Sequence, residues 1–240
     1  DVYKRQVMDV IGNHKRFFSA FSYDTLIDFI DQDENQSFSM TMNVIGEQMK
    51  MQGMIPDHAG KLMALKDFHG LEQHTIDRIF QYATPFNSRH IYQFMNIAKE
   101  VMKQDGRQPG THQGLIDMTF LVHKFMAIKF PQMIGDYFDD LEPFTYSGGS
   151  AQNVYINTEI KQTFPNVIIP PHCADDGISL GCVEFLRRKY NQPEFDKSGF
   201  PYWQTDEAPA ERPSLKTIDQ CAELLAKGKI VGWYQGNGEI

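Results

Sequence analysis

The stretch Phe144–Arg188 decides the expected fold: FTYSGGSAQNVYINTEIKQTFPNVIIPPHCADDGISLGCVEFLRR. Its first apolar run ends in the turn Gly148-Gly149, and helix-like spacing follows over residues 150–163. A second apolar run, Val167–Ile169, leads through Asp175-Asp176-Gly177 into a predicted helix over residues 178–189. This repeated order of strand, glycine turn and helix predicts the α/β fold class.

Two neighbouring turns of this kind predict a ligand site. Open α/β sheets bind ligands outside the carboxyl ends of their strands, and a helix N-terminus there attracts phosphate or carboxylate groups. The backbone amides of Gly148, Gly149 and Gly177 can approach a ligand closely, because glycine has no Cβ. The alternative is that Gly148-Gly149 forms only a tight structural turn.

Four segments, in order along the chain, resemble motifs of the O-carbamoyltransferases. Gly148–Asn153 resembles GG-x-A-x-N, and Ala174–Gly181 resembles GD-x-G-x-x-LG. Gly60–Leu65 is similar to GK-x-MGL, and Lys229–Glu239 is similar to K-IVGW-x-QGR-x-E. These enzymes modify nodulation factors and antibiotics, and they are related to the enzymes that make threonylcarbamoyl-adenosine in tRNA.

The resemblance implies a domain organisation. Residues 7–189 correspond to the C-terminal part of an actin-like carbamoyltransferase domain, the second lobe of an actin-like ATPase fold. Residues 190–212 form a linker, and residues 213–240 start a second α/β domain, similar to threonylcarbamoyl-AMP synthase, that forms carbamoyl-adenylate. The first residues, DVYKRQ, are set aside as a sequencing scar, and the sequence is expected to be a truncated fragment of a longer protein.

The implied reaction uses ATP and carbamoyl phosphate. A carbamoyl-adenylate forms first, and its carbamoyl group then passes to a hydroxyl of a small-molecule acceptor. Two alternatives remain open, a sugar-kinase-like phosphotransferase and a non-catalytic nucleotide-binding scaffold of the same fold. A homodimer is compatible with the sequence. The resemblance identifies no catalytic side chain, and it implies these cofactor-binding residues: Gly148, Gly149, Ser150, Asn153, Gly177, Lys61 and Glu239.

Asp175 is the expected metal ligand, because a carboxylate at a strand end is a hard ligand for a divalent cation. An aspartate before a glycine is also a common turn or helix-cap residue. In the resembling family an aspartate and an H-x-x-x-H pair hold a metal, reported as iron. The eight histidines of this sequence include no i, i+4 pair, so the histidine ligands are missing. Whether Asp175 or Asp176 faces the site stays open.

The net charge, the cysteine count and the length of the apolar runs limit the classes of binding partner and the cellular location. The net charge is −8 and the pI is about 5.4, which argues against a nucleic-acid or anionic-membrane surface. Three cysteines fit a reducing compartment, and every apolar run is shorter than the ~20 residues that span a bilayer. These features predict a cytoplasmic protein.

The remaining elements are predicted from periodicity. Apolar spacing in Gly114–Phe130 predicts a largely buried helix with a stripe of large apolar residues. Ser214 is expected to cap a helix over residues 215–227, followed by a strand over Lys229–Tyr234. The other predicted helices are Phe17–Ile30, Gln73–Tyr82 and Ile91–Gln104.

Overall fold

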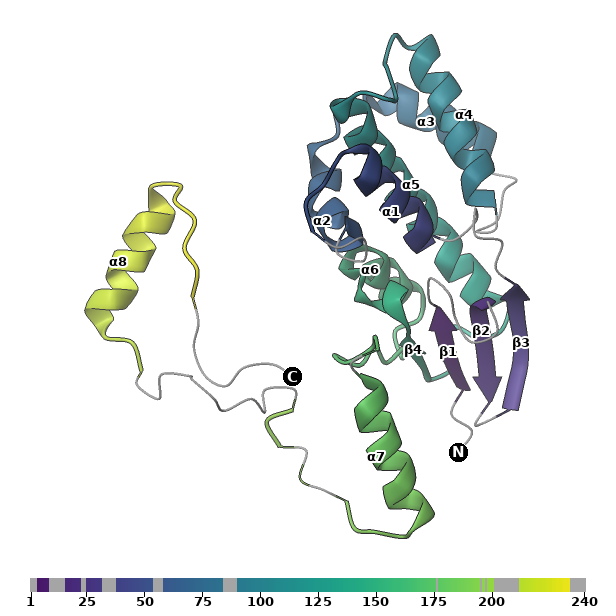
Figure 1. Cartoon of the computed structure of the whole chain (residues 1–240), viewed down its shortest axis with the longest axis vertical. Helices are drawn as coiled ribbons and strands as arrows, with labels where there is room; N and C mark the ends of the chain where they lie inside the picture. The colour runs from purple at the N-terminus through teal and green to yellow at the C-terminus, as the bar shows by residue number, and fades with distance from the viewer. Residues whose placement is uncertain are drawn as a thin grey trace. The chain divides into compact units, whose positions relative to one another are not determined.

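The computed structural model describes residues 4–8, 16–22, 25–31, 38–53, 58–83, 90–175, 177–194, 196, 198–200 and 212–233 (Figure 1). The chain divides into two units, Asp1–Leu180 and Gly181–Ile240. The domain boundaries expected from the sequence, after residues 189 and 212, stay predictions.

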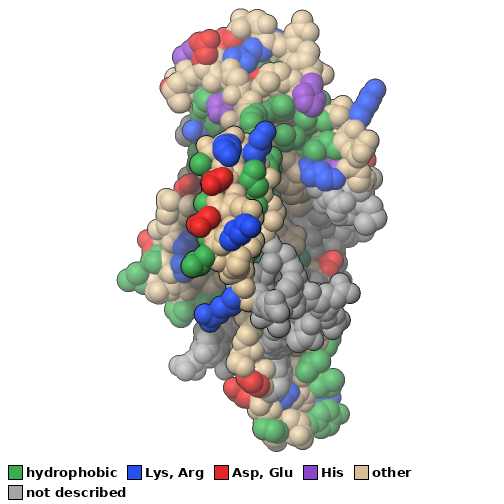
Figure 2. Space-filling view, turned by 90° about the vertical axis from the view of Figure 1, so that its left-hand side faces the viewer, with side chains coloured by type: hydrophobic (Ala, Val, Ile, Leu, Met, Phe, Trp, Pro, Cys, Tyr) green, Lys and Arg blue, Asp and Glu red, His purple; other side chains and the backbone are tan. Residues whose placement is uncertain are grey.

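On the face drawn in Figure 2, acidic and basic side chains are interspersed among hydrophobic ones.

Four strands form one mixed sheet in the order β3-β2-β1-β4. Strand β1 (Lys4–Met8) is antiparallel to β2 (Arg16–Ser22), which is antiparallel to β3 (Thr25–Asp31). Strand β4 (Phe144–Ser147) pairs with the opposite edge of β1 and runs parallel to it. The sheet therefore joins the first segment of the chain to the stretch that carries the glycine turns.

The predicted helix over Phe17–Ile30 is wrong, because this segment contains β2 and most of β3. Its apolar residues fit a helical spacing, but the segment is also rich in phenylalanine and isoleucine. Phenylalanine, isoleucine and threonine favour strands. Pairing of β2 with both of its neighbours satisfies the backbone of this segment and decides between helix and strand.

Helices predominate in the described part of the first unit. The expected alternation of strands and helices is therefore seen only around β4 and the helix that follows it. Helices α1 to α5 gather beside one end of the sheet (Figure 1). Between β3 and β4 the chain forms α1 (Phe38–Gln48), α2 (His58–Leu65), the short 3-10 helix η4 (Lys66–Phe68), α3 (Gln73–Ala83), α4 (Ile91–Gln104) and α5 (His112–Gly135).

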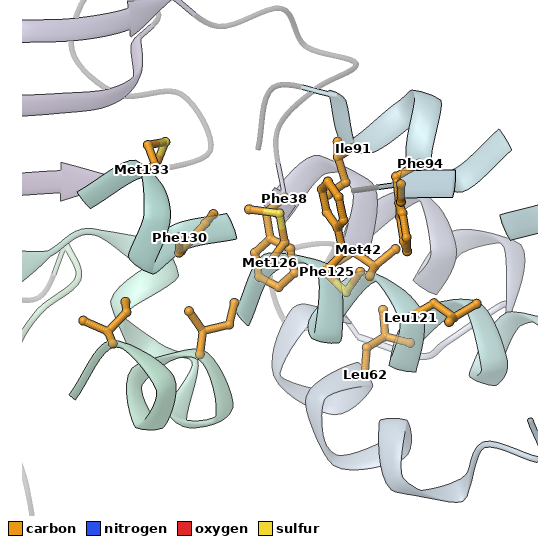
Figure 3. Packing of buried hydrophobic residues seen from close by; sticks show 14 of the residues in the cluster. Phe38, Met42, Leu62, Ile91, Phe94, Leu121, Phe125, Met126, Phe130 and Met133 are labelled. Carbon is orange, nitrogen blue, oxygen red and sulfur yellow. The ribbon is translucent and has the colours of Figure 1, made fainter. Parts of the chain in front are cut away.

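Helix α5 is the centre of the hydrophobic core, and it packs against α1, α2, α4, η4 and α6. The Thr111 side chain begins it by accepting a hydrogen bond from the Gly114 amide. Figure 3 shows its apolar side chains meeting those of the surrounding helices, where Phe125 stacks on Phe94 with ring centroids 4.2 Å apart. The predicted stripe is confirmed, because these residues are all buried: Leu115, Met118, Leu121, Val122, Phe125 and Met126.

The second half of the first unit places the two glycine loops. After β4 come the 3-10 helix η6 (Gly149–Gln152) and α6 (Val154–Thr163), whose inner face is buried. The apolar run Val167–Ile169 then lies beside β4, where Ile168 forms a parallel bridge with Thr145. The Tyr146 amide donates to the Ile168 carbonyl, and the Ile168 amide donates to the Phe144 carbonyl. The predicted second strand is thus present as a single bridge.

The last two helices are α7 (Gly177–Lys189), which spans the boundary between the units, and α8 (Leu215–Ala226). The Ser214 hydroxyl caps α8 by accepting a hydrogen bond from the Thr217 amide at 3.1 Å, as predicted. Residues 229–233 do not form the predicted strand, and Tyr234 lies outside the described residues. Within the part of the chain that the structure describes, no helix is both long and apolar enough to cross a membrane.

Candidate functional site

One backbone hydrogen bond joins the two predicted glycine loops. The Gly148 amide donates to the Cys173 carbonyl at 2.6 Å. Because β4 and Ile168 run in the same direction, the loop after β4 and the loop that leads to Gly177 leave the sheet at the same edge. The structure therefore brings the turn at Gly148 and the loop at Cys173 together.

The backbone conformation at residue 148 requires a glycine. Its backbone has φ 107° and ψ 169°, a conformation that essentially only glycine adopts. Its carbonyl then accepts from the Ala151 amide at 2.9 Å, which closes the turn and starts η6 at Gly149. The short helix η6 packs against α1, β1 and β4, so the turn is held on several sides.

Ser150 and Asn153 follow the turn, and both are buried. The Asn153 side chain accepts a hydrogen bond from the Ile156 amide at 3.1 Å and thereby caps α6. That carboxamide oxygen is committed to the helix. The Ser150 hydroxyl is enclosed and has no hydrogen-bond partner among the described residues, which is costly for a buried polar atom.

The second loop turns tightly at Gly177. The Gly177 amide donates to the Ala174 carbonyl and the Ile178 amide donates to the Asp175 carbonyl, both at 3.1 Å. A Cβ atom on Gly177 would lie 2.1 Å from the His172 carbonyl oxygen, so only glycine fits this close approach. The Asp175 side chain is exposed at the start of α7, and Asp176 lies outside the described residues.

The described residues do not form a complete metal centre. Asp175 is one hard oxygen ligand, and protein cation sites draw several donors together. Within the described ranges no group of three or more histidine, cysteine, aspartate or glutamate side chains is arranged to hold a metal ion. The expected iron could therefore use Asp175 only together with ligands from elsewhere.

Lys61, a predicted binding residue, is not part of this pair of loops. Lys61 is exposed on α2, and its ammonium group donates to the Gln52 carbonyl at 2.5 Å. This bond ties α2 to the connection that follows α1. Glu239 lies outside the described residues.

A polar cluster formed by Lys66, Asp67, His123 and Tyr155, of which Lys66 and His123 are buried, was not predicted from the sequence. The Lys66 ammonium group pairs with Asp67 at 2.5 Å and lies 4.2 Å from the centroid of the Tyr155 ring. The His123 ring lies edge-on to Tyr155 at 6.3 Å, and its Nδ1 lies 2.8 Å from the Thr119 carbonyl oxygen. A lysine in the segment KLMALKDFHG gave no local signal of burial, because its partners come from η4, α5 and α6.

Burial sets the protonation states in this cluster. Desolvation by burial, together with the nearby Lys66 charge, lowers the pKa of His123 from 6.5 to about 4, against the opposing effect of the Thr119 hydrogen bond. Burial also raises the pKa of Tyr155. Near neutral pH the cluster therefore contains a neutral imidazole and a neutral phenol.

A groove of about 670 Å³ runs between the outer face of α6 and the segment Val167–Ile169. Val154, which directly follows Asn153, lies at its end near the glycine turn. Lys161 lines the groove and donates to the Val167 carbonyl at 2.9 Å, which covers part of this sheet edge. The groove is adjacent to the loops, but it lies along the face of α6 opposite to the one that is buried in the core.

No family model matches this sequence.

Proposed function

We propose that this chain is part of an ATP-dependent O-carbamoyltransferase, and that its two glycine loops bind the nucleotide. The observation that carries the proposal is the hydrogen bond from the Gly148 amide to the Cys173 carbonyl. It joins the first residue of the Gly148–Asn153 motif to the residue directly before the Ala174–Gly181 motif. Two loops that follow neighbouring parallel strands and meet at one edge of a sheet are typical of a ligand site.

The local backbone geometry supports anion binding at these loops. Helices α6 and α7 begin within a few residues of Gly148 and Gly177, respectively. Each helix N-terminus carries about half a positive charge. The close approach at Gly177 and the positive φ of Gly148 show that both turns need glycine, as a backbone that closely approaches a phosphate does.

The strand order supports an actin-like lobe. Three antiparallel strands are followed, after a helical connection, by β4, which runs parallel to β1. The Ile168 bridge extends the sheet beyond β4 in the same direction. The proposed actin-like lobe agrees with this strand order.

In the proposed reaction the chain contributes binding and orientation. The positive N-terminal ends of α6 and α7 would attract the phosphates, so that the carbamoyl group formed on the nucleotide faces the acceptor hydroxyl. A metal bound with the help of Asp175 would polarise the carbamoyl carbonyl. The acceptor is a small molecule with a free hydroxyl, and the resemblance gives its class only as sugar-like or a natural product.

Replacing Gly149 by alanine is expected to weaken ATP binding about tenfold, which corresponds to about 1.4 kcal/mol, while lowering the melting temperature by no more than about 2–4 °C. Gly149 is the first residue of η6 and directly follows the turn at Gly148, so a new Cβ there would hinder the approach of a ligand to the proposed nucleotide loop. Isothermal titration calorimetry with Mg-ATP and thermal melting measure the two effects. Gly110→Ala is the matched control, because a Cβ on Gly110 would meet no atom within 4 Å and Gly110 lies outside the proposed loops.

The outcomes separate the candidate functions. Equal losses of binding and stability in Gly149→Ala would leave only a structural turn. ATP hydrolysis that a free sugar stimulates would favour the kinase alternative. ATP binding without any consumption of carbamoyl phosphate by the full-length protein would favour a binding scaffold.

A further inference from the structure

Lys66 is a buried cation at the junction of three elements. The residue is only 8% exposed, although lysine is almost never fully buried unless it is paired. Its ammonium group has two described partners, the Asp67 carboxylate at 2.5 Å and the face of the Tyr155 ring at 4.2 Å. The Asp67 side chain is 73% exposed, so the interior partner of the charge is the aromatic ring.

The contact with the Tyr155 ring links Lys66 to the helix that follows the glycine turn. Tyr155 is the second residue of α6 and follows the Asn153 cap by two positions. A cation over an aromatic face is strongest where water is excluded, and both groups are at least partly desolvated here. His123 on α5 supports the ring from a second direction with an edge-on contact. The ring, and with it the first turn of α6, is thus fixed between η4 and α5.

We infer that Lys66 is a positioning residue for the first turn of α6, the turn that follows the proposed nucleotide loop. Lys66 does not contact that loop itself. It acts through Tyr155, whose backbone is in the same helical turn as Ile156, the residue that Asn153 caps. The effect on nucleotide binding rests on the proposed function, whereas the effect on the backbone of α6 does not.

The inference is tested with single and double variants of the 240-residue chain. Lys66→Met keeps the length of the side chain and removes its charge, and Lys66→Arg restores a cation. Tyr155→Leu removes the ring, and Tyr155→Phe keeps it. Lys124→Met is the matched control, because Lys124 also lies over aromatic rings, those of Phe80 and Phe120 at 5.8 Å, and neither ring belongs to α6.

Hydrogen exchange at the amides of Ile156 and Asn157 is the first readout. Lys66→Met is expected to speed this exchange about tenfold, and Lys66→Arg to restore it to near the wild-type rate. In the double variant of Lys66→Met and Tyr155→Leu, the two losses should not add, because both remove one contact. Lys124→Met should leave these amides unchanged.

The Kd for Mg-ATP is the second readout. Lys66→Met should raise it about tenfold, with rescue by arginine. Unchanged exchange at Ile156 and Asn157 in Lys66→Met would overturn the inference, and so would additive losses in the double variant. If the wild-type chain binds no ATP, the proposed function fails, while the exchange measurements still decide the role of Lys66.

Discussion

Replacing Asp117 by alanine is expected to lower the free energy of unfolding by about 3–5 kcal/mol. The Asp117 carboxylate is 1% exposed on α5 and accepts three hydrogen bonds. The donors are the Gly70 amide at 2.8 Å, Gln113 Nε2 at 3.0 Å and Arg107 Nη1 at 3.1 Å. Alanine would leave all three donors without their acceptor, and Arg107, which also donates to the Gly70 carbonyl, would lose its counter-charge.

Urea unfolding followed by circular dichroism measures this loss. Asp77→Ala on α3 is the control, because Asp77 is exposed and accepts only from Gln73, so its loss should stay within about 0.5 kcal/mol. Asp117→Asn keeps one acceptor oxygen and should fall between the two. A loss below about 1 kcal/mol in Asp117→Ala would contradict the view that this network holds the start of α5 to the loop at Gly70.

Lowering the pH from 6.5 to 4 is expected to remove about 3 kcal/mol of stability through His123 alone. Burial keeps the His123 pKa at about 4 in the folded protein, against 6.5 in an exposed chain. Between these values the unfolded chain binds a proton that the folded protein does not. The contribution is therefore fully present above pH 6.5, is lost as the pH falls toward 4, and is constant below.

Unfolding free energies measured at half-unit pH steps test this, and the comparison is made between variants because carboxylates also titrate in this range. His123→Gln should flatten the pH dependence relative to the wild type. His112→Gln is the control, since His112 is exposed at the start of α5. Parallel curves for the wild type and His123→Gln would show that His123 is not buried in its neutral form.

The long helices could be predicted from the sequence because their apolar spacing is sustained. The predicted bounds Ile91–Gln104 agree with α4. The helix predicted over Gly114–Phe130 is α5, which begins two residues earlier and continues to Gly135 through Pro131. The strands could not be predicted equally well, because a short run such as Phe17–Ser22 has no alternation of apolar and polar residues, and its pairing with distant strands decides its structure.

Part of the candidate site could also be predicted from the sequence, and part could not. Both glycine turns could be located from local sequence, since glycine marks a positive φ or a close approach. Their direct contact through Cys173 and the tight packing at Gly177 required the structure. The cluster around Lys66 could not be predicted, because burial of a lysine depends on an aromatic ring from another element. The roles of Lys61, Asp175 and Glu239 stay predictions.

Hydrogen exchange of the 240-residue chain, measured with and without saturating Mg-ATP, tests whether the loops at Gly148 and Gly177 form one nucleotide site. We expect ATP to slow exchange in two separate segments together, residues 148–150 and residues 174–178, and we expect Gly149→Ala to reduce both effects. Protection of only one segment, protection elsewhere in the chain, or no ATP-dependent change would contradict it.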